Sequence, residues 1–96
     1  MSTKENLKDR FKKFALRVIN LCQVLPKDRV SDVIGKQLLR SGTSVGANYR
    51  AVCRAKSTAD FIHKLQIVEE ELDESLYWIE LLIEPKLSDS KIKQKN

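Results

Sequence analysis

The residue types that most often carry chemistry in helical proteins are scarce in this chain. Its single histidine, His63, follows Asp60 by three residues, and its two cysteines, Cys22 and Cys53, stand far apart. A di-iron site in a helical bundle needs a Glu-x-x-His motif on each of two helices, and this chain offers one Asp-x-x-His. Two isolated cysteines with one histidine do not approach the ligand spacing of a zinc site. The sequence therefore predicts no metal, no cofactor and no evident small-molecule substrate.

Nucleophilic catalysis has no better support. Cys22 falls among apolar residues at helical spacing, where a free thiol behaves as a small hydrophobe. No histidine or acid is spaced to activate it. We therefore predict that this protein is not an enzyme.

Basic residues are the better candidates for a functional surface. They recur on the predicted outer faces of the first two helices, where they could neutralise phosphates without reading bases. The candidate nucleic-acid-binding residues are Arg10, Lys13, Arg17, Lys36, Arg40, Arg50, Arg54 and Lys56. Outer helix faces are commonly charged for solubility alone, but no acid occurs here between Asp32 and Asp60. Structured RNA or a ribonucleoprotein is the expected partner, recognised through its backbone and shape.

An acidic segment offers a competing use for these charges. Residues 1–68 hold 14 basic and 5 acidic residues, residues 69–84 hold no base and 7 acids, and residues 85–96 hold 4 bases and 1 acid. The acids of residues 69–74 could receive the basic stripe of a neighbouring subunit. The alternative function is therefore a protein–protein adaptor or a structural oligomer without nucleic-acid binding.

Three long helices must position these residues. Apolar residues repeat at spacings of three and four along about residues 3–25, 28–55 and 58–84, as one buried helix face requires. Ser2 with Glu5, and Ser57 with Asp60, resemble capping boxes at two of the predicted starts. Pro26 ends the first helix, and Glu84-Pro85 is predicted to end the third. The short connections favour an antiparallel up-down bundle.

The glycine-containing stretch 41–47 is predicted to be helical. A loop is the alternative, since Gly42 and Gly46 each cost a helix about 1 kcal/mol relative to Ala. However, the apolar spacing keeps its phase across residues 34–52, and a loop would restore it only by accident. Both glycines would then admit the backbone of another helix at close range.

The segment 76–83 is apolar on more than one face. Tyr77, Trp78 and Leu81 project away from the Leu76 side of the third helix, so they need cover from a fourth helix or from a second subunit. The candidate residues of an oligomer interface are Gly42, Gly46, Tyr77, Trp78 and Leu81.

These elements predict an all-α protein with a single domain over residues 1–96. No run of about 18 uncharged apolar residues exists to cross a membrane, and residues 1–5 do not open a signal peptide. We therefore expect a cytoplasmic protein without a membrane partner.

The residue runs 40–50, 53–57, 60–65 and 77–82 resemble a bacterial family of four-helix-bundle proteins. Their genes lie in intervening sequences of large-subunit ribosomal RNA genes, and the family is often described as ribosomal-protein-like. The chain is also similar, more remotely, to the accessory variability determinant of diversity-generating retroelements. The first resemblance covers most of residues 7–84 and is specific over residues 40–65.

The resemblance implies an antiparallel four-helix bundle that assembles into a ring-like homopentamer. It also implies nucleic-acid binding, by way of the retroelement relatives, and a helical stretch 41–47. The chain departs from the family pattern after the third helix. Residues 85–96 are expected to form only a short C-terminal stub, a truncated fourth helix.

Overall fold

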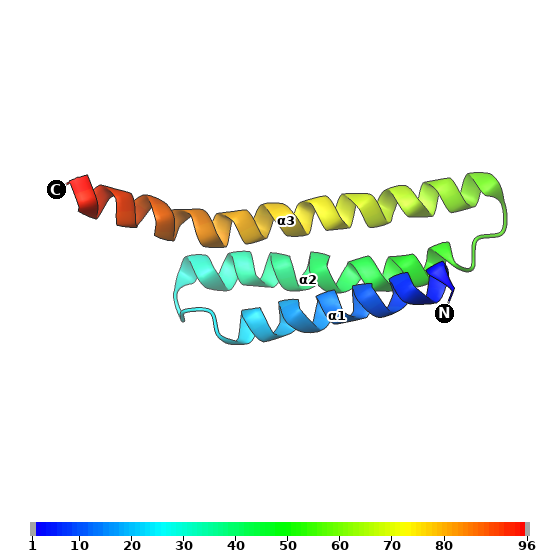
Figure 1. The fold of residues 1–96 in the computed structure, drawn as a ribbon, viewed down its shortest axis with the longest axis horizontal. Helices are drawn as coiled ribbons and strands as arrows, with labels where there is room; N and C mark the ends of the chain where they lie inside the picture. The colour runs from blue at the N-terminus through cyan, green and yellow to red at the C-terminus, as the bar shows by residue number, and fades with distance from the viewer. Residues whose placement is uncertain (1, 96) are drawn as a thin grey trace.

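The protein is all-α in the computed structural model, which describes the backbone of residues 2–95 and the side chains of residues 2–84. Its helices are α1 (Thr3–Gln23), α2 (Arg29–Val52) and α3 (Thr58–Lys95). Figure 1 shows α2 in the middle, running antiparallel to both neighbours. The predicted start of each helix is correct to within a residue, and the stretch 41–47 is helical as expected.

Side chains at the three predicted starts cap the helices. The Ser2 hydroxyl accepts a hydrogen bond from the Glu5 N–H at 3.2 Å, and Asp28 accepts one from Ser31 N–H at 2.7 Å. At α3, Ser57 Oγ accepts from Asp60 N–H at 3.1 Å. Each bond satisfies one of the backbone donors that a helix start leaves free.

The prediction that Pro85 ends the third helix was wrong. α3 continues to Lys95, so residues 85–95 extend it, and the described part of the chain contains no separate fourth helix. Figure 1 shows α3 changing direction in its orange part and running on past the end of α2. Proline removes one helical N–H and crowds the preceding turn, and a helix can accommodate this by bending instead of breaking.

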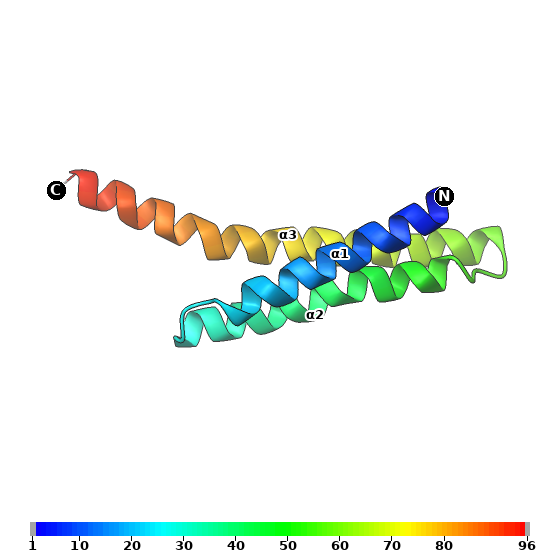
Figure 2. The same cartoon turned by 60° about the horizontal axis from the view of Figure 1, so that its bottom comes forward.

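α2 is the central helix of the packing. It packs against both α1 and α3, whereas among the described residues α1 and α3 do not approach within 8 Å between Cα atoms. The three helices therefore occupy three corners of a bundle. Both views show α2 beside α1 and α3 in the middle of the molecule, and Figure 2 shows α1 crossing α2 at an angle (Figures 1 and 2).

The predicted apolar face of α2 forms the centre of the core. Leu38, Ser41, Val45, Tyr49 and Val52 are all buried. Side chains from both neighbouring helices pack around the cluster of Val45, Tyr49, Val52 and Val68; these are Leu7, Phe11, Phe14, Leu65 and Leu72. A pair of hydroxyls joins α2 to α3 in this core, with Ser75 Oγ lying 2.9 Å from Ser41 Oγ.

Small residues on α2 let α1 approach closely. A methyl group at Gly42 would lie 2.9 Å from Val18 Cγ2, and one at Gly46 would lie 3.5 Å from Phe11 Cβ. The close approach expected at these glycines therefore occurs within the chain, against α1.

Candidate nucleic-acid interface

All eight basic residues singled out in the sequence are exposed, but their surroundings differ. Lys13 pairs with Asp9 at 3.0 Å and Lys36 pairs with Asp32 at 3.1 Å, each within one helix. Arg40 pairs with acids of another helix. For the other five residues, no ion pair with the described part of the chain is found; these are Arg10, Arg17, Arg50, Arg54 and Lys56.

Arg40 connects the basic face of α2 to the acidic segment of α3. Its guanidinium lies 3.4 Å from Glu71 Oε2 and also pairs with Glu74. Glu74 in turn accepts a hydrogen bond from Trp78 Nε1 at 3.2 Å. Two acids of the segment 69–74 are thus engaged by a base of the same chain, which weakens Arg40 as a phosphate ligand.

Basic side chains that form no ion pair within the described residues line a groove between α1 and α2, which we call the basic groove. It has a volume of about 240 Å³, and the residues that line it are Lys8, Phe11, Lys12, Ala15, Thr43, Gly46, Ala47 and Arg50. Among the described residues its lining holds three cations and no carboxylate. Gly46 and Ala47 give the groove its depth, because neither carries a long side chain. Arg54 follows the end of α2 and is exposed, but it does not line the groove.

Sequence reasoning found Arg50 but missed Lys8 and Lys12. They are one helical turn apart on the flank of the Phe11 face. The signal that could have identified them is this spacing together with the small residues of α2, since a small pair on one helix marks where the next helix packs. Without that pairing, nothing in the sequence distinguishes Lys8 and Lys12 from the other lysines.

Arg10, Lys13 and Arg17 lie on the opposite flank of α1. With Phe14 and Leu16 they line an open hollow of about 600 Å³. The basic residues of α1 therefore belong to two separate surfaces, and the sequence analysis recognised only the one formed by Arg10, Lys13 and Arg17.

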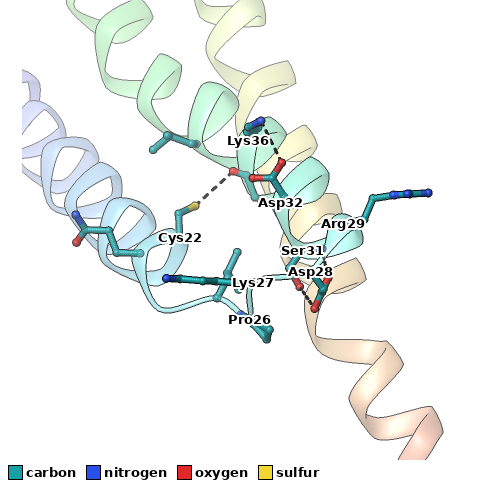
Figure 3. A pocket seen from close by; sticks show the side chains of 12 residues that line it. Cys22, Pro26, Lys27, Asp28, Arg29, Ser31, Asp32 and Lys36 are labelled. Atoms are coloured by element: carbon teal, nitrogen blue, oxygen red, sulfur yellow. Dashed lines mark hydrogen bonds and ion pairs between the residues drawn. The ribbon is translucent and has the colours of Figure 1, made fainter.

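An open hollow of about 560 Å³ lies at the α1–α2 turn (Figure 3). Cys22 points from α1 toward α2, where its thiol donates a weak hydrogen bond to the Gly35 carbonyl at 3.4 Å. Burial raises the pKa of the Cys22 thiol, which disfavours the nucleophilic thiolate. Asp28 and Asp32 are committed to Ser31 and Lys36. The thiol and the two carboxylates of this hollow are thus engaged in local contacts.

Other side chains that could take part in chemistry lie outside this hollow. Burial, and then the neighbouring Cys53, raise the pKa of the Tyr49 hydroxyl. His63 is exposed on α3. Within the described residues, no group of three or more histidines, cysteines and acids is placed to hold a metal ion. None of the helices, over the residues described, is long and apolar enough to cross a membrane.

The candidate interface residues fall into two groups. Gly42 is buried against Val18, and Gly46 lies against Phe11 of the same chain. On α3, Tyr77 is exposed, Trp78 and Leu81 are half-buried, and the rings of Tyr77 and Trp78 lie 5.2 Å apart. An interface role stays a prediction for these α3 residues, whereas packing against α1 already accounts for the two glycines.

The fold and the basic groove together define an all-α protein with antiparallel helices and a positively charged surface. Comparison with known families identifies it further: the chain belongs to the 23S rRNA-intervening sequence proteins, whose family model matches residues 5–95. The resemblance seen in the sequence is thereby confirmed for this family. The likeness to the retroelement accessory protein stays a prediction.

A solved structure supports the same assignment. It is a protein of unknown function from the S23 ribosomal protein family of Bacteroides thetaiotaomicron, 44% identical to this chain, with a TM-score of 0.80. The match covers 90% of this chain and 77% of that protein. A comparison with curated proteins gives no match.

Proposed function

We propose that this chain is a non-enzymatic helical protein that binds structured RNA through the basic groove. The observation that carries the proposal is the meeting of Lys8, Lys12 and Arg50 across α1 and α2 with no carboxylate in the described lining. Cations placed together in this way neutralise successive phosphates and release their counterions. They contact the backbone of a nucleic acid and not its base edges, so weak sequence preference is expected.

The names of the family and of its solved relative refer to ribosomal RNA and to a ribosomal protein, which is why RNA is the partner proposed. The family's members are described as 23S rRNA-intervening sequence proteins, and the solved relative belongs to a family named for a ribosomal protein. The basic groove also lacks an exposed aromatic platform, since Phe11 is half-buried and its ring packs edge-on against Tyr49 at 5.2 Å. Stacking of single-stranded bases is therefore not the expected mode, whereas a duplex backbone fits a row of cations.

A second candidate function is a structural oligomer or protein adaptor without RNA binding. The observation in its favour is the pairing of Arg40 with Glu71 and Glu74. Here a basic side chain of α2 forms ion pairs with acidic side chains of the same protein, so the basic residues need not be free for RNA. Exposed apolar residues on α3 point the same way, with Leu76 and Tyr77 each 53% exposed.

Binding of a fluorescein-labelled RNA hairpin, followed by fluorescence anisotropy over a range of salt concentrations, tests the RNA proposal. The variant is Lys8→Glu/Lys12→Glu, and the control is Lys27→Glu/Arg29→Glu, which changes net charge equally at the start of α2. We expect the groove variant to lose at least about 10-fold in affinity, and its salt slope to fall by about 0.7–0.9 for each lost phosphate contact. Equal losses in both variants, or none, would contradict a role for the groove.

A further inference from the structure

One side chain in the lining of the basic groove differs in chemistry from its polar neighbours. The polar side chains there are Lys8, Lys12, Thr43 and Arg50. Charged lysine and arginine side chains can only donate hydrogen bonds, whereas a hydroxyl can also accept them. Among the described residues of the lining, Thr43 is therefore the one whose side-chain oxygen can accept a hydrogen bond from a ligand.

The helix itself commits the Thr43 hydroxyl to this role. Thr43 Oγ1 donates to the Leu39 carbonyl at 2.7 Å and also lies 3.2 Å from the Arg40 carbonyl oxygen. A hydroxyl has one proton and two lone pairs, and here the proton is used by the backbone. Since Thr43 is exposed, a ligand in the groove meets an oxygen that accepts and does not donate.

The Thr43 oxygen is also fixed in position before any ligand binds. A threonine in a helix has few side-chain rotamers, and the hydrogen bond to the Leu39 carbonyl selects one of them. The ends of Lys8 and Lys12, in contrast, lose rotamer freedom when they hold a ligand. A contact made by Thr43 therefore has a small entropic cost.

Thr43 shares one side of α2 with the arginine of the groove. The spacings from Thr43 to Ala47 and from Ala47 to Arg50 are four and three residues, which places them on one helix face. All three residues line the groove. Thr43 and Arg50 are therefore two turns apart, about 10.5 Å along the helix axis.

A lysine of α1 stands almost level with Thr43. Phe11 lies against Gly46, so Lys12, the next residue of α1, is about level with Gly46. Gly46 is three residues from Thr43, a rise of about 4.5 Å along α2. A cation that can hold a phosphate and an oxygen that can accept a hydrogen bond thus lie close together along the two walls of one groove.

The sugar–phosphate backbone of RNA carries both groups that this arrangement can bind. Its phosphates attract cations but have no proton to donate at neutral pH. The 2′-hydroxyl of the ribose can donate, and DNA lacks it. In an RNA duplex these hydroxyls line the wide, shallow minor groove. An acceptor among cations therefore matches RNA, whereas DNA would leave the Thr43 oxygen without a donor.

We propose that Thr43 accepts a hydrogen bond from a ribose 2′-hydroxyl and thereby makes the basic groove selective for double-stranded RNA over DNA. The inference rests on the proposed function, in which Lys8, Lys12 and Arg50 hold phosphates. Thr43 adds a contact at the minor-groove edge of the same duplex. One neutral hydrogen bond of this kind corresponds to a preference of about 2- to 10-fold.

A double-mutant cycle between protein and RNA tests the proposal. The ligands are a fluorescein-labelled RNA hairpin and the same hairpin with 2′-fluoro groups, which keep the A-form shape but cannot donate. Thr43→Val removes the acceptor and keeps the branched shape, whereas Thr43→Ser keeps the hydroxyl. In anisotropy titrations, the wild type and Thr43→Ser should bind RNA about 2- to 10-fold more tightly than the fluorinated hairpin. Thr43→Val should bind both hairpins equally, with the affinity of the wild type for the fluorinated one.

Ser44→Ala is the matched control. Ser44 Oγ donates to the Arg40 carbonyl at 2.6 Å, so its hydroxyl is bonded to the helix backbone as that of Thr43 is. Ser44 is the next residue of α2 but does not line the groove. Its replacement should leave the preference for RNA unchanged, and circular dichroism checks that every variant stays helical.

The outcomes separate this inference from the function on which it rests. If the wild type binds both hairpins equally, or if Thr43→Val keeps the preference, Thr43 does not contact the 2′-hydroxyl. A loss of affinity in Lys8→Glu/Lys12→Glu would still support the basic groove in that case. If the wild type binds neither hairpin, the proposed function fails and this inference fails with it. A preference that Ser44→Ala also removes would mean that the hydroxyls act through the helix and not through contact with RNA.

Discussion

At the residue scale, the glycines of α2 show how strongly the packing of α1 depends on the absence of a single methyl group. Gly42 faces Val18, whose branched side chain has few rotamers, and a methyl group there would lie within 3.0 Å of both Val18 γ-carbons. Gly46 faces Phe11 at ordinary van der Waals distance. Substitution by alanine should therefore lower the free energy of unfolding at Gly42 and raise it at Gly46, although the two positions are only one turn apart.

We predict that Gly46→Ala stabilises the protein by up to about 1 kcal/mol, since alanine is the better helix former. Gly42→Ala should lose about 1–2 kcal/mol net, because overpacking against Val18 outweighs the same gain. Urea unfolding followed by circular dichroism measures both free energies. Gly35→Ala is the control, since its methyl group would meet only the flexible end of Leu25. Equal effects at Gly42 and Gly46 would contradict the packing described for α1.

Much at this scale could be read from the sequence. The buried face of α2 follows from the spacing of Leu38, Val45 and Val52, because period alone fixes which residues share a side. The basic groove could not be read in the same way. Lys8 and Arg50 are 42 positions apart, and their meeting depends on which flank of α1 turns toward α2. That choice rests on packing at the glycines, which no local pattern specifies.

At the element scale, the helix starts depend on carboxylates as well as hydroxyls. Hydrogen bonds from the Ser31 backbone N–H and hydroxyl hold the pKa of Asp28 below its ordinary value. A hydrogen bond from Lys64, and then one from the Lys56 backbone N–H, do the same for the pKa of Asp60. Both carboxylates therefore favour the folded state while they are ionised.

We predict an acid-sensitive stability with a defined direction. The contribution of Asp28 and Asp60 is complete above the ordinary aspartate pKa of about 3.9 and is lost as pH falls through their lower folded-state pKa values. Asp28→Asn/Asp60→Asn should keep most of the capping hydrogen bonds, but the melting temperature of this variant should fall less than that of the wild type as pH is lowered. Thermal melts at a series of pH values measure this. If the wild type and the variant lose stability in parallel as pH falls, other groups control the acid transition.

The element boundaries also show where sequence rules stop working. The starts of all three helices were predictable, because a capping side chain is a local device. The end of α3 was not, because a proline forbids one hydrogen bond but does not forbid a bent helix. The continuation to Lys95 is a property of the whole helix, which a dipeptide rule at Glu84-Pro85 cannot capture.

At the scale of the whole molecule, α1 separates two charged surfaces. Lys8 and Lys12 line the basic groove, whereas Arg10 and Arg17 line the hollow on the other flank of α1. Both surfaces are positively charged, so a change in net charge alone would affect RNA binding equally from either one. A direct phosphate contact would distinguish them.

The last prediction is therefore that charge reversal on the two flanks of α1 has unequal effects on hairpin binding. Lys8→Glu/Lys12→Glu and Arg10→Glu/Arg17→Glu lower the net charge by the same amount, so their long-range electrostatic effects on affinity should be equal. The loss of direct phosphate contacts should weaken binding further in the first variant alone, and only there should the salt slope fall. Anisotropy titrations of the same hairpin at several salt concentrations separate the two effects. A loss of the same size in both variants would show that net charge, and not the basic groove, holds the RNA.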